Sequence, residues 1–129
     1  MARARIADVE GRDAVRAWAT ADGTAGSGTA VDRDTLALAV RYTLQLLAEQ
    51  APGNSVEVRV PPFGAVQCVE GPRHTRGTPP NVVETDPATW LALAVGDEGW
   101  ADARADGRIR ASGTRADLTG LVPLIDRVR

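Results

Sequence analysis

The clearest pattern along the chain is a strand followed by a helix within the stretch Val56–Gly96. The stretch begins Val-Glu-Val-Arg-Val, and this alternation places three valines on one face of a strand. A strand that is apolar on one face only is typical of an antiparallel or mixed sheet covered on a single side. After Asp86 the spacing becomes helical, with Asp86 as N-cap, Pro87 at the first helical position and Gly96 just past the end.

Helices are also predicted before this unit. Asp13–Ala21 has the composition of a short helix, and the small, turn-forming residues of Asp22–Thr29 predict a flexible connector. Beyond Asp32, leucines and valines recur at helical spacing, so we expect an amphipathic helix to about Gln50.

Four further strands are expected from shorter patterns. Ala65–Glu70 and Asn81–Glu84 read as the second and third strands. Trp100–Arg104 and Arg108–Ser112 are separated by Asp106-Gly107, which predicts a hairpin.

The last predicted element is a helix that opens at Thr114, where Asp117 three residues later resembles a capping box. About five strands and three or four helices indicate an α+β fold, a two-layer sandwich whose mixed or antiparallel sheet is covered on one face by helices. We expect an N-terminal part, residues 1–31, and one domain, residues 32–129.

Composition limits the function. The 129 residues suit one domain, and a single cysteine allows no internal disulfide. No apolar run approaches the roughly 18 to 20 residues of a membrane span, and no signal peptide is seen, so we expect a cytoplasmic protein without stable membrane insertion. All 15 basic residues are arginines, spread among 17 acids. We therefore expect no nucleic-acid partner.

The residues offer little for catalysis. One histidine and one cysteine make a zinc site improbable, and the glycines of Gly23–Gly28 lack the P-loop lysine, so no metal or cofactor is expected. Cys68 and His74 are the only candidate nucleophile and base, but a thiol in an apolar strand is more often a small core residue. Arg73, His74 and Arg76 form a cationic loop that could hold an anionic head group, with solvated loop charge as the alternative.

Three stretches resemble the bacterial, actinobacterial sterol-carrier-like family: Val60–Cys68, Pro72–Asn81 and Thr85–Leu91. The tail Gly107–Gly113 is similar to the end of the wider sterol carrier protein-2 superfamily. The resemblance spans about Asp32–Leu124. It implies a five-stranded mixed sheet with helices on one side and a hydrophobic tunnel between them for a lipid, fatty acyl chain or sterol-like molecule.

The leading hypothesis is therefore a non-catalytic domain that carries an apolar small molecule or lipid. A core of Ala, Val and Leu with few aromatic residues could leave room between sheet and helices. The residues expected to line that pocket are Leu44, Leu47, Val66, Trp90, Leu91, Ala94, Leu118, Leu121 and Val122.

Two other hypotheses stay open. One is an interaction module that forms a homodimer or docks onto an enzyme partner. The resemblance suggests such a partner, because related domains are attached to a mycothiol-dependent, metal-binding helical bundle of the maleylpyruvate isomerase type. The other is an enzyme that uses Cys68 and His74.

Overall fold

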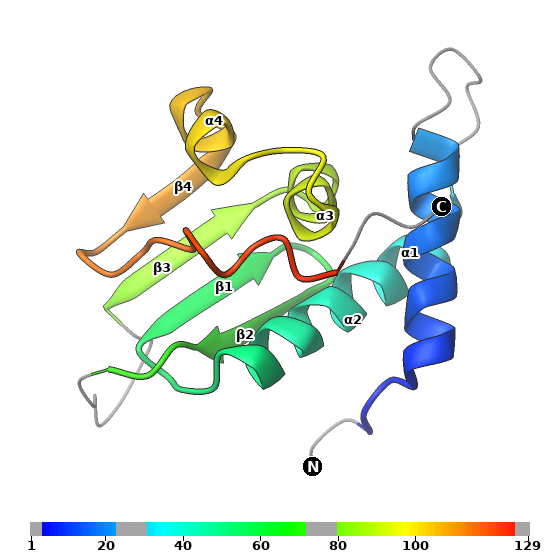
Figure 1. Ribbon diagram of the computed structural model, residues 1–129, viewed down its shortest axis with the longest axis horizontal. Helices are drawn as coiled ribbons and strands as arrows, with labels where there is room; N and C mark the ends of the chain where they lie inside the picture. The colour runs from blue at the N-terminus through cyan, green and yellow to red at the C-terminus, as the bar shows by residue number, and fades with distance from the viewer. Residues whose placement is uncertain (1–3, 23–30, 72–79, 126–129) are drawn as a thin grey trace.

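A mixed four-stranded sheet with four helices makes up the structure, a computed structural model that describes residues 4–22, 31–71 and 80–125 (Figure 1). In chain order the elements are α1 (Asp8–Asp22), α2 (Arg33–Gln50), β1 (Val56–Val60), β2 (Gly64–Cys68), β3 (Asn81–Thr85), α3 (Pro87–Val95), α4 (Trp100–Ala105) and β4 (Ile109–Ser112).

The strands lie in the order β2-β1-β3-β4. β1 pairs antiparallel with β2 and parallel with β3, and β3 pairs antiparallel with β4. In this register Val58 lies opposite both Val66 and Val83. β2 and β4 are therefore the two edge strands.

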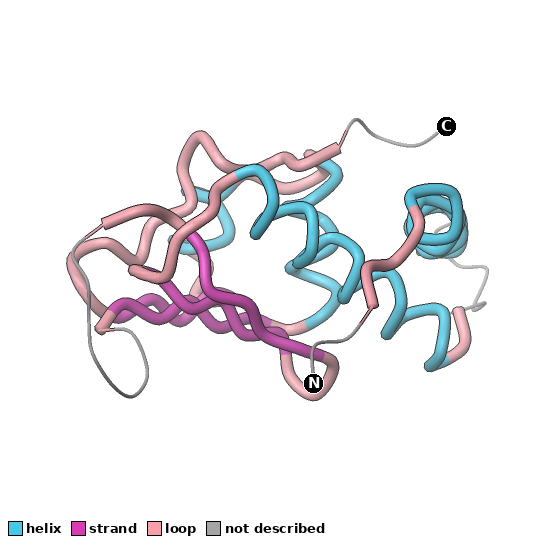
Figure 2. Tube along the Cα trace, turned by 90° about the horizontal axis from the view of Figure 1, so that it is seen from below, coloured by secondary structure: helices cyan, strands magenta, loops and turns pink. Residues whose placement is uncertain are grey.

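Helices α2 and α3 lie on one face of the sheet, and α1 lies beside α2 at the end of the molecule (Figure 2). The three valines of β1 are buried beneath the helices, whereas Glu57 and Arg59 are only half-buried on the opposite face. An α+β fold is thus confirmed. Within the part of the chain that the structure describes, no helix combines the length and apolar character needed to cross a bilayer.

Helices α2 and α3 both begin directly after an aspartate that caps their first turn. The Asp32 carboxylate accepts a hydrogen bond from the Thr35 amide at 2.7 Å, and the Asp86 carboxylate accepts one from the Thr89 amide at 3.0 Å. α3 ends at Gly96, whose φ of 86° is the left-handed conformation that glycine adopts readily.

The sheet has four strands, not five, because the predicted strand Trp100–Arg104 is helix α4. Trp100 and Ala103 are its buried residues, and this spacing of three places both on one side of a helix. The predicted hairpin turn is also wrong: Asp106 caps the end of α4, and Gly107 follows with a φ of 78°.

The predicted C-terminal helix is absent from the described residues. Asp117 does not cap a helix; its carboxylate accepts hydrogen bonds from the amide and the hydroxyl of Thr119, which stabilises a local turn instead. The chain then crosses the helix-covered side of the sheet in extended and turn conformations (Figure 1). The Leu124 amide donates to the Ala94 carbonyl of α3 at 2.8 Å, and the Gln50 side chain donates to the Leu124 carbonyl at 3.3 Å.

Two boundaries differ from the prediction. α1 starts at Asp8, five residues earlier than expected, and β2 ends at Cys68 because Val69 has a φ of 66°. The Val69 amide bonds to the Ala51 carbonyl, so this left-handed residue turns the chain back toward the end of α2. The predicted connector, apart from Asp22, lies outside the described residues.

A buried hydrogen bond joins helices α2 and α3. The Trp90 indole N–H of α3 donates to the Thr43 hydroxyl of α2 at 2.8 Å, and both side chains are 0% exposed. The Thr43 hydroxyl lies within hydrogen-bond distance of the Ala39 and Val40 carbonyls of its own helix. Thr43 therefore supplies the indole with an acceptor inside an otherwise apolar core.

Helix α1 approaches α2 closely at Gly11, where a Cβ atom would overlap the ring of Tyr42. The Tyr42 hydroxyl donates to the Asp8 carboxylate at 2.8 Å. That hydrogen bond, followed by the one from Arg5, lowers the pKa of Asp8. The fit between glycine and tyrosine therefore sets how α1 packs against α2.

Replacing Thr43 by valine is expected to lower the free energy of unfolding by about 1–3 kcal/mol, because the buried Trp90 N–H loses its acceptor without a change in side-chain volume. Thr43→Ser keeps the hydroxyl and should cost less. Urea denaturation measures both. The effect of Thr43→Val should shrink in a Trp90→Phe background, and an equal loss there would contradict the role of the hydrogen bond.

Gly11→Ala should destabilise the protein by about 1–2 kcal/mol, since crowding against Tyr42 outweighs the better helix propensity of alanine. Thermal unfolding followed by circular dichroism measures the loss. Glu10→Ala, at an exposed neighbouring position on α1, is the control and should stay within about 0.5 kcal/mol of the parent. A Gly11→Ala variant as stable as this control would show that α1 does not pack on Tyr42 as described.

Candidate functional site

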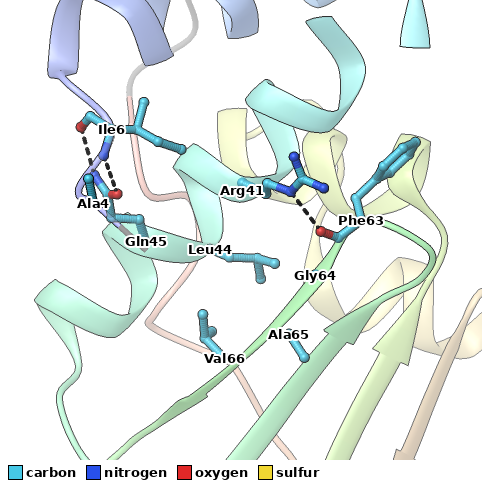
Figure 3. A pocket seen from close by; sticks show the side chains of 9 residues that line it. All are labelled: Ala4, Ile6, Arg41, Leu44, Gln45, Phe63, Gly64, Ala65 and Val66. Atoms are coloured by element: carbon cyan, nitrogen blue, oxygen red, sulfur yellow. Dashed lines mark hydrogen bonds between the residues drawn. The ribbon is translucent and has the colours of Figure 1, made fainter. Parts of the chain in front are cut away.

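An open groove of about 360 Å³ lies where α2 meets the edge strand β2 (Figure 3). We call it the edge groove. The segment that precedes α1 forms one wall, α2 another, and the start of β2 the third. Its lining residues are Ala4, Ile6, Arg41, Leu44, Gln45, Phe63, Gly64, Ala65 and Val66.

The groove stays open because Gly64 has no side chain. A Cβ atom placed there would lie 3.4 Å from a Leu44 methyl group and 3.8 Å from Cγ of Arg41. Two residues along β2, Val66 is on the same side of the strand, and it is only half-buried. Val66 thus offers apolar surface that the core does not enclose at the sheet edge, whereas Leu44 lines the groove but is only 2% exposed.

The N-terminal wall is held by a side-chain amide. The Ile6 N–H donates to Oε1 of Gln45 at 2.8 Å, and Nε2 of Gln45 donates to the Ile6 carbonyl at 3.0 Å (Figure 3). Arg5 adds an ion pair of 2.6 Å to Glu49 of α2. These contacts keep Ala4 and Ile6 against α2, so a segment far away in the sequence completes the groove.

Among the described residues that line the groove, Arg41 is the positively charged one. Its Nε–H donates to the Phe63 carbonyl at 2.9 Å, which ties α2 to the turn between β1 and β2 (Figure 3). Phe63 in turn lies under the guanidinium of Arg33, 5.1 Å from the ring centroid. Within the described residues, no acidic side chain forms an ion pair with Arg41.

A second hollow, of about 270 Å³, lies near the Pro61-Pro62 turn. Its lining includes Arg59 and Glu84, which face each other in the register of β1 and β3. It therefore presents charges of both signs, whereas Arg41 is the charged residue in the described lining of the edge groove.

The predicted pocket residues separate into three groups. Leu44 and Val66 line the edge groove. Leu47, Trp90, Leu91, Ala94 and Leu118 are buried in the core, and Leu121 and Val122 are half-buried on the C-terminal segment. A pocket between the sheet and the helices stays a prediction. The predicted head-group residues, Arg73, His74 and Arg76, lie outside the described residues.

Sequence reasoning missed most of the groove lining. Arg41 is the one charged position in the middle of α2, between Leu36 and Ala48, and Phe63-Gly64 belongs to the stretch that carries the family resemblance. Both could have been singled out. Ile6 and Gln45 could not, because no spacing rule links a residue before α1 to the middle of α2.

The thiol has an environment that works against catalysis. Cys68 is 0% exposed, and burial raises its pKa to about 11, so the thiol is protonated near neutral pH. Its predicted base, His74, lies outside the described residues. Among the residues the structure describes, no group of three or more His, Cys, Asp or Glu side chains could hold a metal ion.

Iodoacetamide should modify Cys68 of the native protein at pH 8 on the order of a hundredfold more slowly than in 8 M urea, because the buried thiol is neither ionised nor accessible. Mass spectrometry over time measures the two rates. Similar rates would restore Cys68 as a candidate nucleophile.

A comparison with protein families gives a match. No curated protein matches the chain. A family described as "Bacterial SCP ortholog" matches residues 32–124, which leaves Ala4, Ile6 and α1 outside the matched region. The family expected from the sequence motifs is thereby confirmed. The chain belongs to the bacterial SCP orthologs, a sterol-carrier-like family.

Proposed function

We propose that this chain is a non-catalytic carrier that holds an apolar or amphipathic small molecule in the edge groove. The observation that carries the proposal is an open, largely apolar groove in a domain of a carrier-type family. Its volume of about 360 Å³ falls within the range typical of small-molecule sites, about 300–1,000 Å³.

The distribution of groups in the groove supports binding of a small molecule without chemistry. The half-buried side chains of Ile6 and Val66 offer apolar contact, and burial of apolar surface is the main favourable term for such ligands. Among the described residues that line the groove, none is a histidine, cysteine or carboxylate that could act as a general base or nucleophile.

An interaction module is the second candidate, and the edge strand favours it. The side chains of β2, Gly-Ala-Val-Gln-Cys, carry no charge, although edge strands are commonly protected by charged residues or proline. A second copy of the chain or an enzyme partner could therefore pair with β2. A ligand in the groove and a partner on the strand would give different masses in the same measurement.

Native mass spectrometry of gently purified protein should show the chain with an added mass of a few hundred daltons, the mass range of lipid-like ligands. A mass corresponding to two chains would instead support the interaction module. A chain of unmodified mass, together with no saturable fluorescence change on titration with Nile Red, would rule out the carrier proposal.

Gly64→Val is the matched test of the site. The new side chain should fill the groove beside Leu44 and weaken Nile Red binding about tenfold, while β-branching suits the strand and keeps stability near that of the parent. Gln67→Val, on the same strand but facing the open side of the sheet, is the control and should leave binding unchanged. Equal affinity of both variants would place the ligand elsewhere.

A further inference from the structure

The segment before α1, residues 4–7, is attached differently from the other two walls of the edge groove. We call this segment the strap. α2 and β2 are a helix and a strand with their own backbone hydrogen bonds, whereas the Ile6 backbone is held by the side chain of Gln45 (Figure 3). The strap is therefore the wall that can move without unfolding an element of secondary structure.

Two side chains on one side of α2, Gln45 and Glu49, hold the strap. Gln45 exchanges two hydrogen bonds with the Ile6 backbone. Glu49 accepts two from the Arg5 guanidinium, at 2.6 and 2.9 Å, and both of these charged side chains are more than two fifths exposed. Exposed pairs of this kind contribute little net free energy, because water competes for both partners. The strap is thus attached by contacts that break and re-form readily.

α1 is anchored in another way. Its Val15 and Trp18 side chains are buried and belong to the hydrophobic core. Exposing large apolar side chains to water is costly, so α1 stays on α2 when the strap opens. The strap can therefore open about the start of α1, at Asp8.

The position of Leu44 gives such a movement a purpose. Leu44 lines the groove, yet its side chain is almost fully buried in this structure. A ligand that packs on Leu44 needs one of the surrounding walls to move. The strap contributes Ala4 and Ile6 to the lining, and of the three walls it has the weakest attachment.

We propose that the strap is a gate of the edge groove. Closed, as in this structure, it retains a bound molecule; open, it widens the groove beside α2 and admits one. The family match begins at residue 32, so the gate lies outside the matched region and belongs to this chain. This inference rests on the carrier function proposed above and adds the way in which binding and release are controlled.

Amide hydrogen exchange followed by NMR tests the gate without a ligand. The protection factor of the Ile6 N–H should be at least about tenfold lower than that of the Val15 N–H in the middle of α1, because the strap opens while α1 stays in place. Gln45→Leu removes the acceptor of the Ile6 N–H and should abolish its protection without a change at Val15. Equal protection of the two amides in the parent would show that the strap and α1 open only together, and would refute the gate.

Stopped-flow mixing with Nile Red measures how the gate affects binding. Association and release should each be about fivefold faster in Gln45→Leu and in Arg5→Gln than in the parent, the size expected for losing an exposed polar contact. Gln67→Leu makes the same chemical change as Gln45→Leu on the open face of the sheet and should leave both rates unchanged. Because Nile Red carries no charge, NaCl should speed its association with the parent by screening the pair of Arg5 with Glu49, and Arg5→Gln should lack this effect.

The outcomes separate the gate from the carrier function. Saturable binding of Nile Red with the same rates in the parent and in Gln45→Leu would overturn the gate and leave the carrier function standing. Equally faster rates in Gln67→Leu would show an effect unrelated to the strap and would overturn the gate as well. No binding of Nile Red to the parent would refute the carrier function and the gate with it.

Discussion

The rest of the structure depends on covering helix α2, which is apolar around most of its circumference. Its buried residues are Ala37, Ala39, Val40, Tyr42, Thr43, Leu44, Leu46 and Leu47. A helix with such a wide apolar surface is stable only when neighbours cover it on more than one side. The sheet and α3 cover one side, and α1 covers another through the contact between Gly11 and Tyr42. α2 is thus the element to which the other layers attach.

The edge groove is the place where this cover is incomplete. β2 is an edge strand, so beyond it no further strand extends the sheet in the described structure. Gly64 leaves a gap beside Leu44, and the segment around Ile6 closes the opposite side without filling it. Two of the three walls belong to the region that matches the family, and the third comes from the preceding segment. The shape of the groove is therefore a property of this chain and not of the family alone.

The polar side chains near the groove also stabilise the fold. Gln45 uses both the oxygen and the nitrogen of its amide to hold the Ile6 backbone, and Arg41 uses its Nε–H to hold the β1–β2 turn. Arg41 keeps further N–H donors besides this one. The Cys68 thiol differs from these polar groups. Burial raises its pKa, so the thiol behaves as a small apolar side chain.

Local patterns in the sequence determined the elements whose signals are short-range: the alternating valines of β1, the capped helices α2 and α3, and the fold class. They failed where the same residues suit two conformations. Trp100–Ala105 is helical because Trp100 and Ala103 bury on one side. The chain after Thr114 forms local turns, such as the one at Asp117, before Leu124 and Ile125 bond to the Ala94 carbonyl of α3. The groove could be identified only from the tertiary structure. Its walls come from residues up to about sixty positions apart, and only packing around α2 brings Ile6, Arg41 and Val66 together.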